Sequence, residues 1–204
     1  MSFYSISKSK IFCSSYSMIN FLNTLSIDGS FLIEENIFND FRGSFNRLFD
    51  DRKFKNLKFD YVKNINVSKN LKKGTFRGLH MQKGSFAESK IIYCNKGSII
   101  DLFVDCRKES STFGYVNKVM LDEKNINTLL VPRGCLHSFL TLEDDTEVIY
   151  LTDNYYSPES EISVSPFSEK IINELNPYKI EVCSEKDRNS ISFSEFIEKI
   201  KAPN

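Results

Sequence analysis

The feature that most constrains the fold is a succession of short apolar runs, each ended by a polar turn such as Asn95-Lys96-Gly97. Runs of this length, rich in β-branched and aromatic residues, are typical of strands rather than helices. The pattern predicts an all-β sandwich or barrel. Strands are expected around the Asp28-Gly29 turn between residues 21 and 37, and at 57–68, 75–82, 88–93, 98–105, 115–121, 127–131, 138–142 and 147–152, with 88–93 and 98–105 paired as a hairpin.

Helices are expected mainly near the C-terminal end. Residues 169–175 form a short helical segment that stops before Pro177, because the residue preceding a proline is pushed out of the helical conformation. Ser192 and Glu195 form a capping box ahead of Phe196, which predicts a final amphipathic helix packed on the barrel. The length of 204 residues suits one domain at 21–204 after a Ser-rich, poorly ordered extension at 1–20.

Charge and cysteine content narrow the class of protein. The chain has 27 basic and 27 acidic residues, so nothing favours general binding to nucleic acid or to a membrane surface. No apolar run approaches the ~18 residues of a membrane span. The 5 cysteines are scattered and odd in number, which predicts free thiols and a cytoplasmic, reducing location.

The stretch Thr75-Phe-Arg-Gly-Leu-His-Met-Gln82 carries one of only 2 histidines. Regular strand alternation would place Arg77, Leu79 and Met81 on one face, and Phe76, His80 and Gln82 on the other. An imidazole in such a strand either lines a pocket or needs a buried partner. Taken alone, a histidine of this kind is more often structural.

Three motifs follow one another in a specific order. They are Arg77-Gly-Leu-His-x-Gln82, the segment from Asp105 to Gly114, and Val131-Pro-Arg-Gly-x-x-His137-Ser-Phe139. Together they make the chain, from about residue 25 to 187, resemble the dTDP-4-dehydrorhamnose 3,5-epimerase family. The resemblance implies a cupin-type jelly roll, a homodimer, and a nucleoside-diphosphate-linked 4-keto sugar as substrate.

The resemblance also implies that neither a metal nor another cofactor is used. Two histidines 57 positions apart, without a His-x-His pair, would in any case make a poor ligand set.

The C4 ketone of such a sugar acidifies the hydrogens on C3 and C5, so epimerisation needs a base, an acid on the opposite face, and a group that stabilises the enolate. His80 is the expected base. The resemblance implies that its carboxylate partner is an aspartate late in the chain, which we expect to be Asp187, with Asp153 as a weaker rival. The resemblance assigns Tyr150 as the acid and Lys90 to the ketone oxygen. A tyrosine on an apolar strand would otherwise be a core residue.

Substrate-binding positions follow from the same resemblance. An arginine can hold a diphosphate through two hydrogen bonds, and both Arg42, beside Gly43, and Arg77 are expected to do so. The remaining expected contacts are His137 to the sugar, Tyr155 or Tyr156 to the sugar or base, and the polar side chains of Asn64, Asn66 and Gln82.

The chain departs from the family at its recognition positions. Arg47 stands where an acidic residue is usual, Leu130 and residues 164–166 replace tryptophan-containing positions, and the chain has no tryptophan. These changes favour the same chemistry on another sugar or nucleotide, such as a GDP-, CDP- or UDP-linked hexose or heptose, with C3, C5 or both inverted. The alternatives are a cupin-type keto-isomerase and a sugar-nucleotide-binding module without activity.

Overall fold

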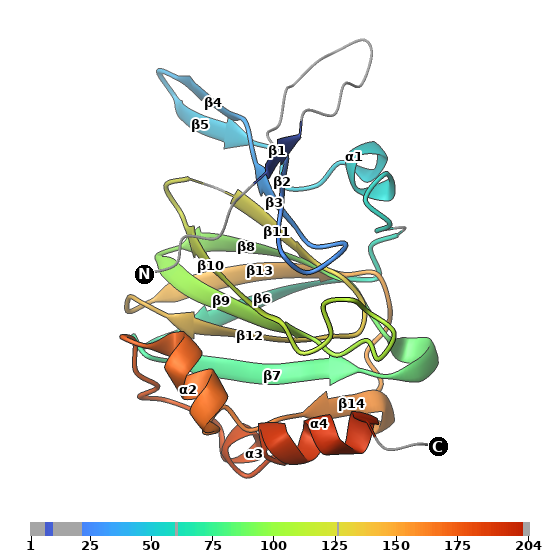
Figure 1. The fold of residues 1–204 in the computed structure, drawn as a ribbon. Coiled ribbons are helices and arrows are strands. Elements are labelled where there is room, and N and C mark those ends of the chain that lie inside the picture. Colours follow the sequence, from blue (N-terminus) through green and yellow to red (C-terminus); the bar gives the residue numbers. More distant parts are fainter. Residues whose placement is uncertain (1–6, 10–21, 60, 126, 202–204) are drawn as a thin grey trace.

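The computed structural model describes residues 7–9, 22–59, 61–125 and 127–201, and it contains two antiparallel sheets that face each other (Figure 1). The larger sheet has seven strands in the order β1 (Ser7–Ser9), β2 (Leu22–Thr24), β3 (Phe31–Glu34), β11 (Asn127–Val131), β8 (Lys90–Lys96), β13 (Thr146–Thr152) and β6 (Asn64–Asn70). The smaller sheet has five, in the order β10 (Val116–Asp122), β9 (Ser98–Asp105), β12 (Cys135–Thr141), β7 (Phe76–Gln82) and β14 (Glu161–Ser163). The predicted all-β, cupin-type jelly roll is confirmed.

The helices are short, and most lie near the C-terminal end, as expected. They are α1 (Asp51–Lys55), α2 (Glu169–Leu175), α3 (Glu185–Arg188) and α4 (Phe193–Lys201), with single 3-10 turns at Gly84–Phe86 and Pro158–Ser160. The predicted helix at 169–175 is confirmed at both ends, and the Ser192 hydroxyl accepts a hydrogen bond from the Glu195 amide at the start of α4. No helix in the described ranges is long and apolar enough to cross a membrane.

Two sequence predictions, about the pairing of one pair of strands and the extent of another strand, are wrong. Residues 88–93 and 98–105 do not form a hairpin, because β8 pairs with β11 and β13 while β9 pairs with β10 and β12 in the other sheet. Gly97, with φ of 76°, lets the chain turn from one sheet into the other. The segment 57–68 is not extended throughout, since α1 is followed by a turn and the strand begins only at Asn64.

Three apolar clusters hold the layers together. One fills part of the space between the sheets and includes Ile92 and Phe103. A second lies where α2 and α4 cover the outer face of the smaller sheet, with Phe193 and Phe196 buried. The third packs Phe54 and Phe59 against the outer face of the larger sheet. The first cluster does not fill the whole space between the sheets. Polar side chains from both sheets line the part that remains.

The motif from Asp105 to Gly114 clamps the loop that follows β9. The buried Asp105 carboxylate accepts hydrogen bonds from the Arg107 guanidinium and from the Ser110 and Thr112 hydroxyls. Burial alone would raise the pKa of Asp105, but these bonds outweigh it and hold the pKa at about 2. This motif is therefore structural in the described fold.

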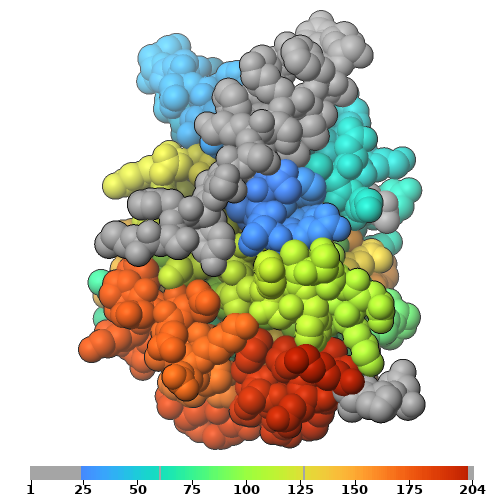
Figure 2. Space-filling view, viewed as in Figure 1, coloured from blue at the N-terminus to red at the C-terminus, as the bar shows by residue number. Residues whose placement is uncertain are grey.

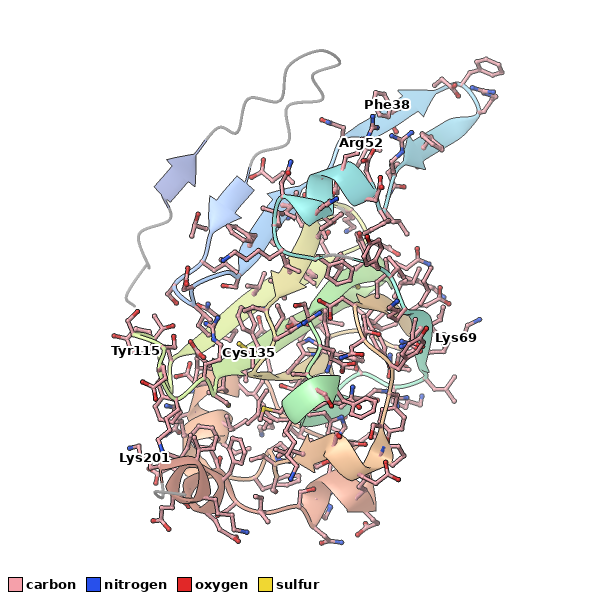
Figure 3. The ribbon with its side chains drawn as sticks, turned by 90° about the vertical axis from the view of Figure 1, so that its right-hand side faces the viewer. Phe38, Arg52, Lys69, Tyr115, Cys135 and Lys201 are labelled. Carbon is pink, nitrogen blue, oxygen red and sulfur yellow. The ribbon has the colours of Figure 1, made fainter. Side chains whose placement is uncertain are left out.

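A separate hairpin of β4 (Ile37–Asp40) and β5 (Gly43–Asn46) extends away from the sandwich. It forms a protruding lobe in Figure 2, at the opposite end of the molecule from the C-terminal helices, and Phe38 lies on it in Figure 3. Of the predicted extension at 1–20, only Ser7–Ser9 fall within the described residues, and they pair with β2.

Candidate active site

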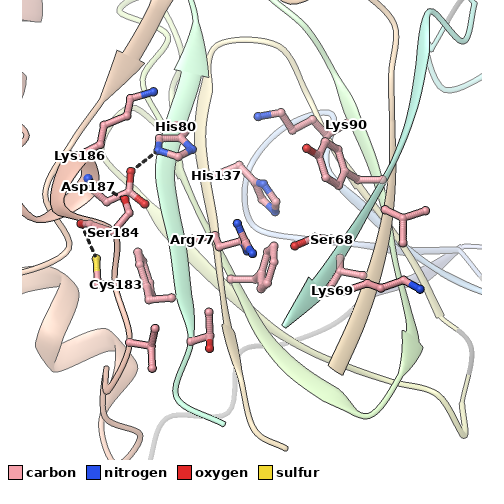
Figure 4. A pocket seen from close by; sticks show the side chains of 17 residues that line it. Ser68, Lys69, Arg77, His80, Lys90, His137, Cys183, Ser184, Lys186 and Asp187 are labelled. Carbon is pink, nitrogen blue, oxygen red and sulfur yellow. Dashed lines mark hydrogen bonds and ion pairs between the residues drawn. The ribbon is translucent and has the colours of Figure 1, made fainter. Parts of the chain in front are cut away.

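A cavity of about 670 Å³ lies between the two sheets (Figure 4). Its walls come from β6, β8 and β13 of the larger sheet, from β7 and β12 of the smaller sheet, and from residues 182–187. A smaller cavity of about 300 Å³ shares His80, Lys90 and Tyr150 with it. The two cavities therefore meet at three of the predicted catalytic side chains.

A bulge in β7 determines which side chains reach the cavity. His80 pairs with His137 of β12, and Arg77 pairs with Phe139, so two residues of β7 lie opposite Ser138 alone. Arg77 and His80 consequently line the cavity together, while Leu79 belongs to the cluster under the C-terminal helices. The predicted regular alternation, which placed Arg77 on the face opposite His80, is wrong because the bulge inserts one residue.

Gly78 makes this bulge possible. Its φ is 123°, a backbone angle that residues other than glycine rarely adopt. A Cβ atom at this position would lie 2.5 Å from the Ser138 Cβ and 2.6 Å from the His137 carbonyl oxygen. The glycine of the Arg-Gly-Leu-His motif is thus required by the approach of β12.

His80 and Asp187 form the predicted pair. The His80 Nε2 lies 2.6 Å from Asp187 Oδ1, although 107 residues separate them in the sequence. Asp187 lies on α3, where its amide donates to the Ser184 hydroxyl, and only 6% of its side chain is exposed. Burial would raise the pKa of Asp187, but hydrogen bonding to His80 and to the Gly78 amide lowers it, so the group is a carboxylate at neutral pH.

The alternative prediction, that Asp153 is the carboxylate partner of His80, is wrong. The Asp153 carboxylate accepts hydrogen bonds from the Ser89 amide at 2.7 Å and from the Arg133 guanidinium at 3.0 Å, and it is not among the side chains that line either cavity. Asp153 directly follows β13, which ends at Thr152, and lies beside Ser89, the residue before β8. Asp153 therefore fastens two loops to each other.

Tyr150 and Lys90 project from the larger sheet, on the wall opposite His80. Tyr150 is half-buried on β13, where burial raises its pKa, the charge of Glu88 raises it further, and Arg77 opposes both effects. Lys90 begins β8, and its Nζ lies 3.3 Å from Glu88 Oε1. The cavity thus has an imidazole on one wall and a protonated phenol with an ammonium on the other.

His137 is part of a second histidine–carboxylate pair. Its Nε2 lies 2.7 Å from Asp101 Oδ2, and the Asp101 side chain is fully buried. Asp101 was missed by the sequence reasoning. Its position in the middle of the apolar strand 98–105 was the signal that could have found it, because a buried charge requires a partner.

The predicted binding residues differ in how they reach the cavities. Arg77 lines the larger one, with its Nε donating to Asn70 at 2.7 Å. Asn64, Asn66, Gln82 and Tyr156 line the smaller one. The Tyr156 hydroxyl donates to Glu161, which also accepts from Lys186; neither Glu161 nor Lys186 was predicted. Tyr155 lies in neither lining, so of the two tyrosines the geometry favours Tyr156.

Arg42 does not reach the cavity of its own chain. It follows β4 at the tip of the protruding hairpin, where it pairs with Asp40 at 2.6 Å and leaves 76% of its side chain exposed. Arg42 is therefore not among the side chains that line either cavity of its own chain. Within the described ranges, no group of three or more His, Cys, Asp or Glu side chains is arranged to hold a metal ion.

Comparisons with known proteins agree on one family. The family model described as dTDP-4-dehydrorhamnose 3,5-epimerase matches residues 24–195. The enzyme of that name from Salmonella typhimurium is 40% identical over 136 residues, which are 65% of this chain and 73% of the enzyme.

Solved structures give the same result. The crystal structure of the enzyme of that name from Elizabethkingia anophelis has a TM-score of 0.79 and 32% identity, covering 86% of this chain and 97% of the other. A Legionella pneumophila dTDP-6-deoxy-D-glucose-3,5-epimerase, solved with dTDP-4-keto-L-rhamnose, also has a TM-score of 0.79, at 28% identity over 88% of this chain and 95% of the other.

Proposed function

The chain belongs to the dTDP-4-dehydrorhamnose 3,5-epimerase family, and from this premise we propose that His80 and Tyr150 exchange protons on opposite faces of a nucleotide-linked 4-keto sugar. The enzyme is a nucleotide-sugar epimerase. His80 removes the proton from the carbon beside the ketone, and Tyr150 returns one to the other face of the same carbon. Inversion follows because base and acid project from different sheets.

The observation that carries this proposal is the 2.6 Å contact between His80 and Asp187 inside the cavity that Tyr150 and Lys90 also line. Asp187 accepts the hydrogen bond from Nε2, which leaves Nδ1 to receive the substrate proton, and its charge stabilises the imidazolium that results. The Lys90 ammonium lies against the ketone oxygen and stabilises the enolate charge.

Charge pairing supports a diphosphate contact for Arg77. Three lysines in the cavity linings have carboxylate partners: Lys69 with Glu147, Lys90 with Glu88 and Lys186 with Glu161. The Arg77 Nε instead donates to Asn70, whose amide is neutral and leaves the guanidinium charge uncompensated by that bond. A guanidinium in this state is well suited to bind a diphosphate. His137, Asn64, Asn66 and Tyr156 supply the remaining contacts to the sugar nucleotide. Gln82, also expected to bind the substrate, lines the smaller cavity with its amide already bonded to Glu88 and to the main chain of two loops.

We further propose that the enzyme is a cytoplasmic homodimer. Phe38, Phe41 and Phe45 of the β4–β5 hairpin are 50%, 98% and 63% exposed, and an isolated two-stranded hairpin is marginally stable in water. A second copy would cover these side chains and could bring Arg42 to the nucleotide end of its own cavity. Cys94, Cys106, Cys135 and Cys183 are free thiols, which is consistent with a reducing compartment.

The alternative of an inactive binding module has less support. Such a module predicts that one of His80, Asp187 or Tyr150 fails to reach the pocket, whereas all three line the same cavity. A keto-isomerase would also need a base and an acid, but the Arg-Gly-Leu-His arrangement and the family match both favour epimerisation.

Solvent deuterium exchange tests the proposal. Purified protein is incubated in D₂O with dTDP-, GDP-, CDP- and UDP-linked 4-keto hexoses, and NMR records deuterium at C3 and C5. We expect exchange and inversion with at least one nucleotide, no exchange by His80→Asn, and exchange with little inverted product by Tyr150→Phe. If the wild type exchanges neither position on any of these sugars, the protein is not the proposed enzyme.

A further inference from the structure

Glu88 is a buried carboxylate within the smaller cavity that the sequence analysis did not consider. Only 10% of its side chain is exposed, and its Oε1 lies 3.3 Å from the Nζ of Lys90, whose side chain is 12% exposed. Burying a carboxylate is costly unless it is paired and hydrogen-bonded. A largely buried ion pair that lines a cavity therefore indicates a function that a solvent-exposed surface ion pair would not have.

Gln82 fixes the position of Glu88. Its Nε2 donates to Glu88 Oε2 at 3.0 Å and to the carbonyl oxygens of Phe86 and Tyr155, while its Oε1 accepts from the Ser157 amide at 2.6 Å. These bonds tie the amide to the main chain of two separate loops. Glu88 is thus anchored from behind while its other oxygen faces Lys90.

The charge of Glu88 also acts on Tyr150. Burial is the main reason that the pKa of Tyr150 is raised, and Glu88 raises it further, against the opposing charge of Arg77. A phenol must be protonated to serve as a general acid. The ionisable side chains that line the smaller cavity with Tyr150 are His80, Glu88, Lys90, Tyr156 and Glu161. Those that line only the larger cavity with it are Lys69, Arg77, His137, Cys183, Lys186 and Asp187.

We propose that Glu88 is a positioning residue of the epimerase site, which holds the Lys90 ammonium at the ketone oxygen. This inference rests on the proposed function, in which Lys90 and Tyr150 act on the substrate. Glu88 then has the relation to Lys90 that Asp187 has to His80 and Asp101 has to His137. Each of these three side chains in the cavity lining is paired with its own carboxylate.

Glu88→Gln removes the charge and keeps the shape of the side chain. With the sugar nucleotide that the wild type turns over fastest in the deuterium panel, we expect kcat to fall about tenfold or more, with little change in KM. The high-pH limb of the kcat profile should move to lower pH, because the repulsion that opposes ionisation of Tyr150 is lost. Glu88→Asp, which retains the charge, should recover part of the rate.

Glu35→Gln is the matched control, because Glu35 also forms a buried ion pair with a lysine, Lys53, at 2.7 Å but lines neither cavity. It should lower the melting temperature without changing kcat or the pH profile. A Glu88→Gln enzyme that behaves like this control, or that changes KM alone, overturns the inference while the proposed function stands. If Glu88→Gln does not fold, Glu88→Asp decides: a wild-type kcat despite the shortened side chain overturns the positioning role. Absence of exchange by the wild type would overturn both.

Discussion

Replacement of Asp187 by asparagine tests the central contact of the proposed mechanism. The two side chains are nearly isosteric, so α3 and the bond from the Asp187 amide to Ser184 should persist. The negative charge 2.6 Å from His80 Nε2 is lost, and an asparagine that presents its NH₂ group would force the imidazole into the wrong tautomer. We therefore expect a loss of rate rather than a loss of fold.

The size of the effect follows from the geometry. Two unit charges ~4 Å apart interact by about 4 kcal/mol at an effective dielectric constant of ~20. His80 is 33% exposed on its side chain, so solvent screening reduces the benefit. A loss of ~2–4 kcal/mol of transition-state stabilisation corresponds to a ~30- to 1000-fold lower kcat.

Single-turnover deuterium exchange measures this loss directly, because it reports proton abstraction and not product release. Asp153→Asn is the control: this residue is also a buried aspartate, but it bonds to Arg133 and the Ser89 amide, and it lines neither cavity. It should lower the melting temperature while its rate per folded molecule stays within about threefold of wild type. A folded Asp187→Asn enzyme with a wild-type exchange rate, or an equal loss in both variants, would refute the assignment of Asp187.

Three further results are expected. Gly78→Ala should lower the unfolding free energy, measured in urea, by ~2–5 kcal/mol, because the new Cβ would clash with β12. Gly114→Ala, at a φ of 79° with nothing within 4 Å of the new Cβ, should lower it by only ~1 kcal/mol. Equal losses in the two variants would contradict the bulge argument. Because the pKa of Asp105 is about 2, below the ordinary value of ~3.9 for an aspartate, its carboxylate contributes about 2 kcal/mol of stability above pH ~4. This contribution is lost as the pH falls through ~2. The stability difference between wild type and Asp105→Asn should shrink accordingly over that range, and a constant difference would exclude this. Phe41→Ser combined with Phe45→Ser should shift sedimentation from dimer to monomer, and an unchanged dimer would remove the hairpin from the interface.

The sequence allowed prediction of features that depend on local pattern. The helix at 169–175 was predicted at both ends, because apolar spacing and Pro177 both act within a few residues. The strand at 127–131 was bounded by polar turns and was predicted equally well. The class of fold and the family followed from many such segments in order.

Features that depend on tertiary pairing were not predictable in this way. The segments at 88–93 and 98–105 look like a hairpin locally, but both are buried on both faces, and only the two-sheet arrangement separates them. The contact of His80 with Asp187 could be expected only from the family resemblance, because 107 residues separate them. Asp101 was overlooked because its partner His137 comes from another strand. Glu88 lies two residues from Lys90 in the sequence, but only the fold shows that this pair is largely buried and that Gln82 of β7 holds the carboxylate.

The Arg-x-x-His spacing of β7 shows how one residue can decide a site. In a regular strand, positions three apart lie on opposite faces, so Arg77 would have been buried under the C-terminal helices and the cavity would have lost a cation. The bulge opposite Ser138 changes the parity and brings Arg77 to the same face as His80. It requires a residue with φ of 123° and no side chain, which only glycine supplies without strain. The glycine of the motif therefore has no chemical role of its own, yet the joint presence of base and guanidinium in one cavity depends on it.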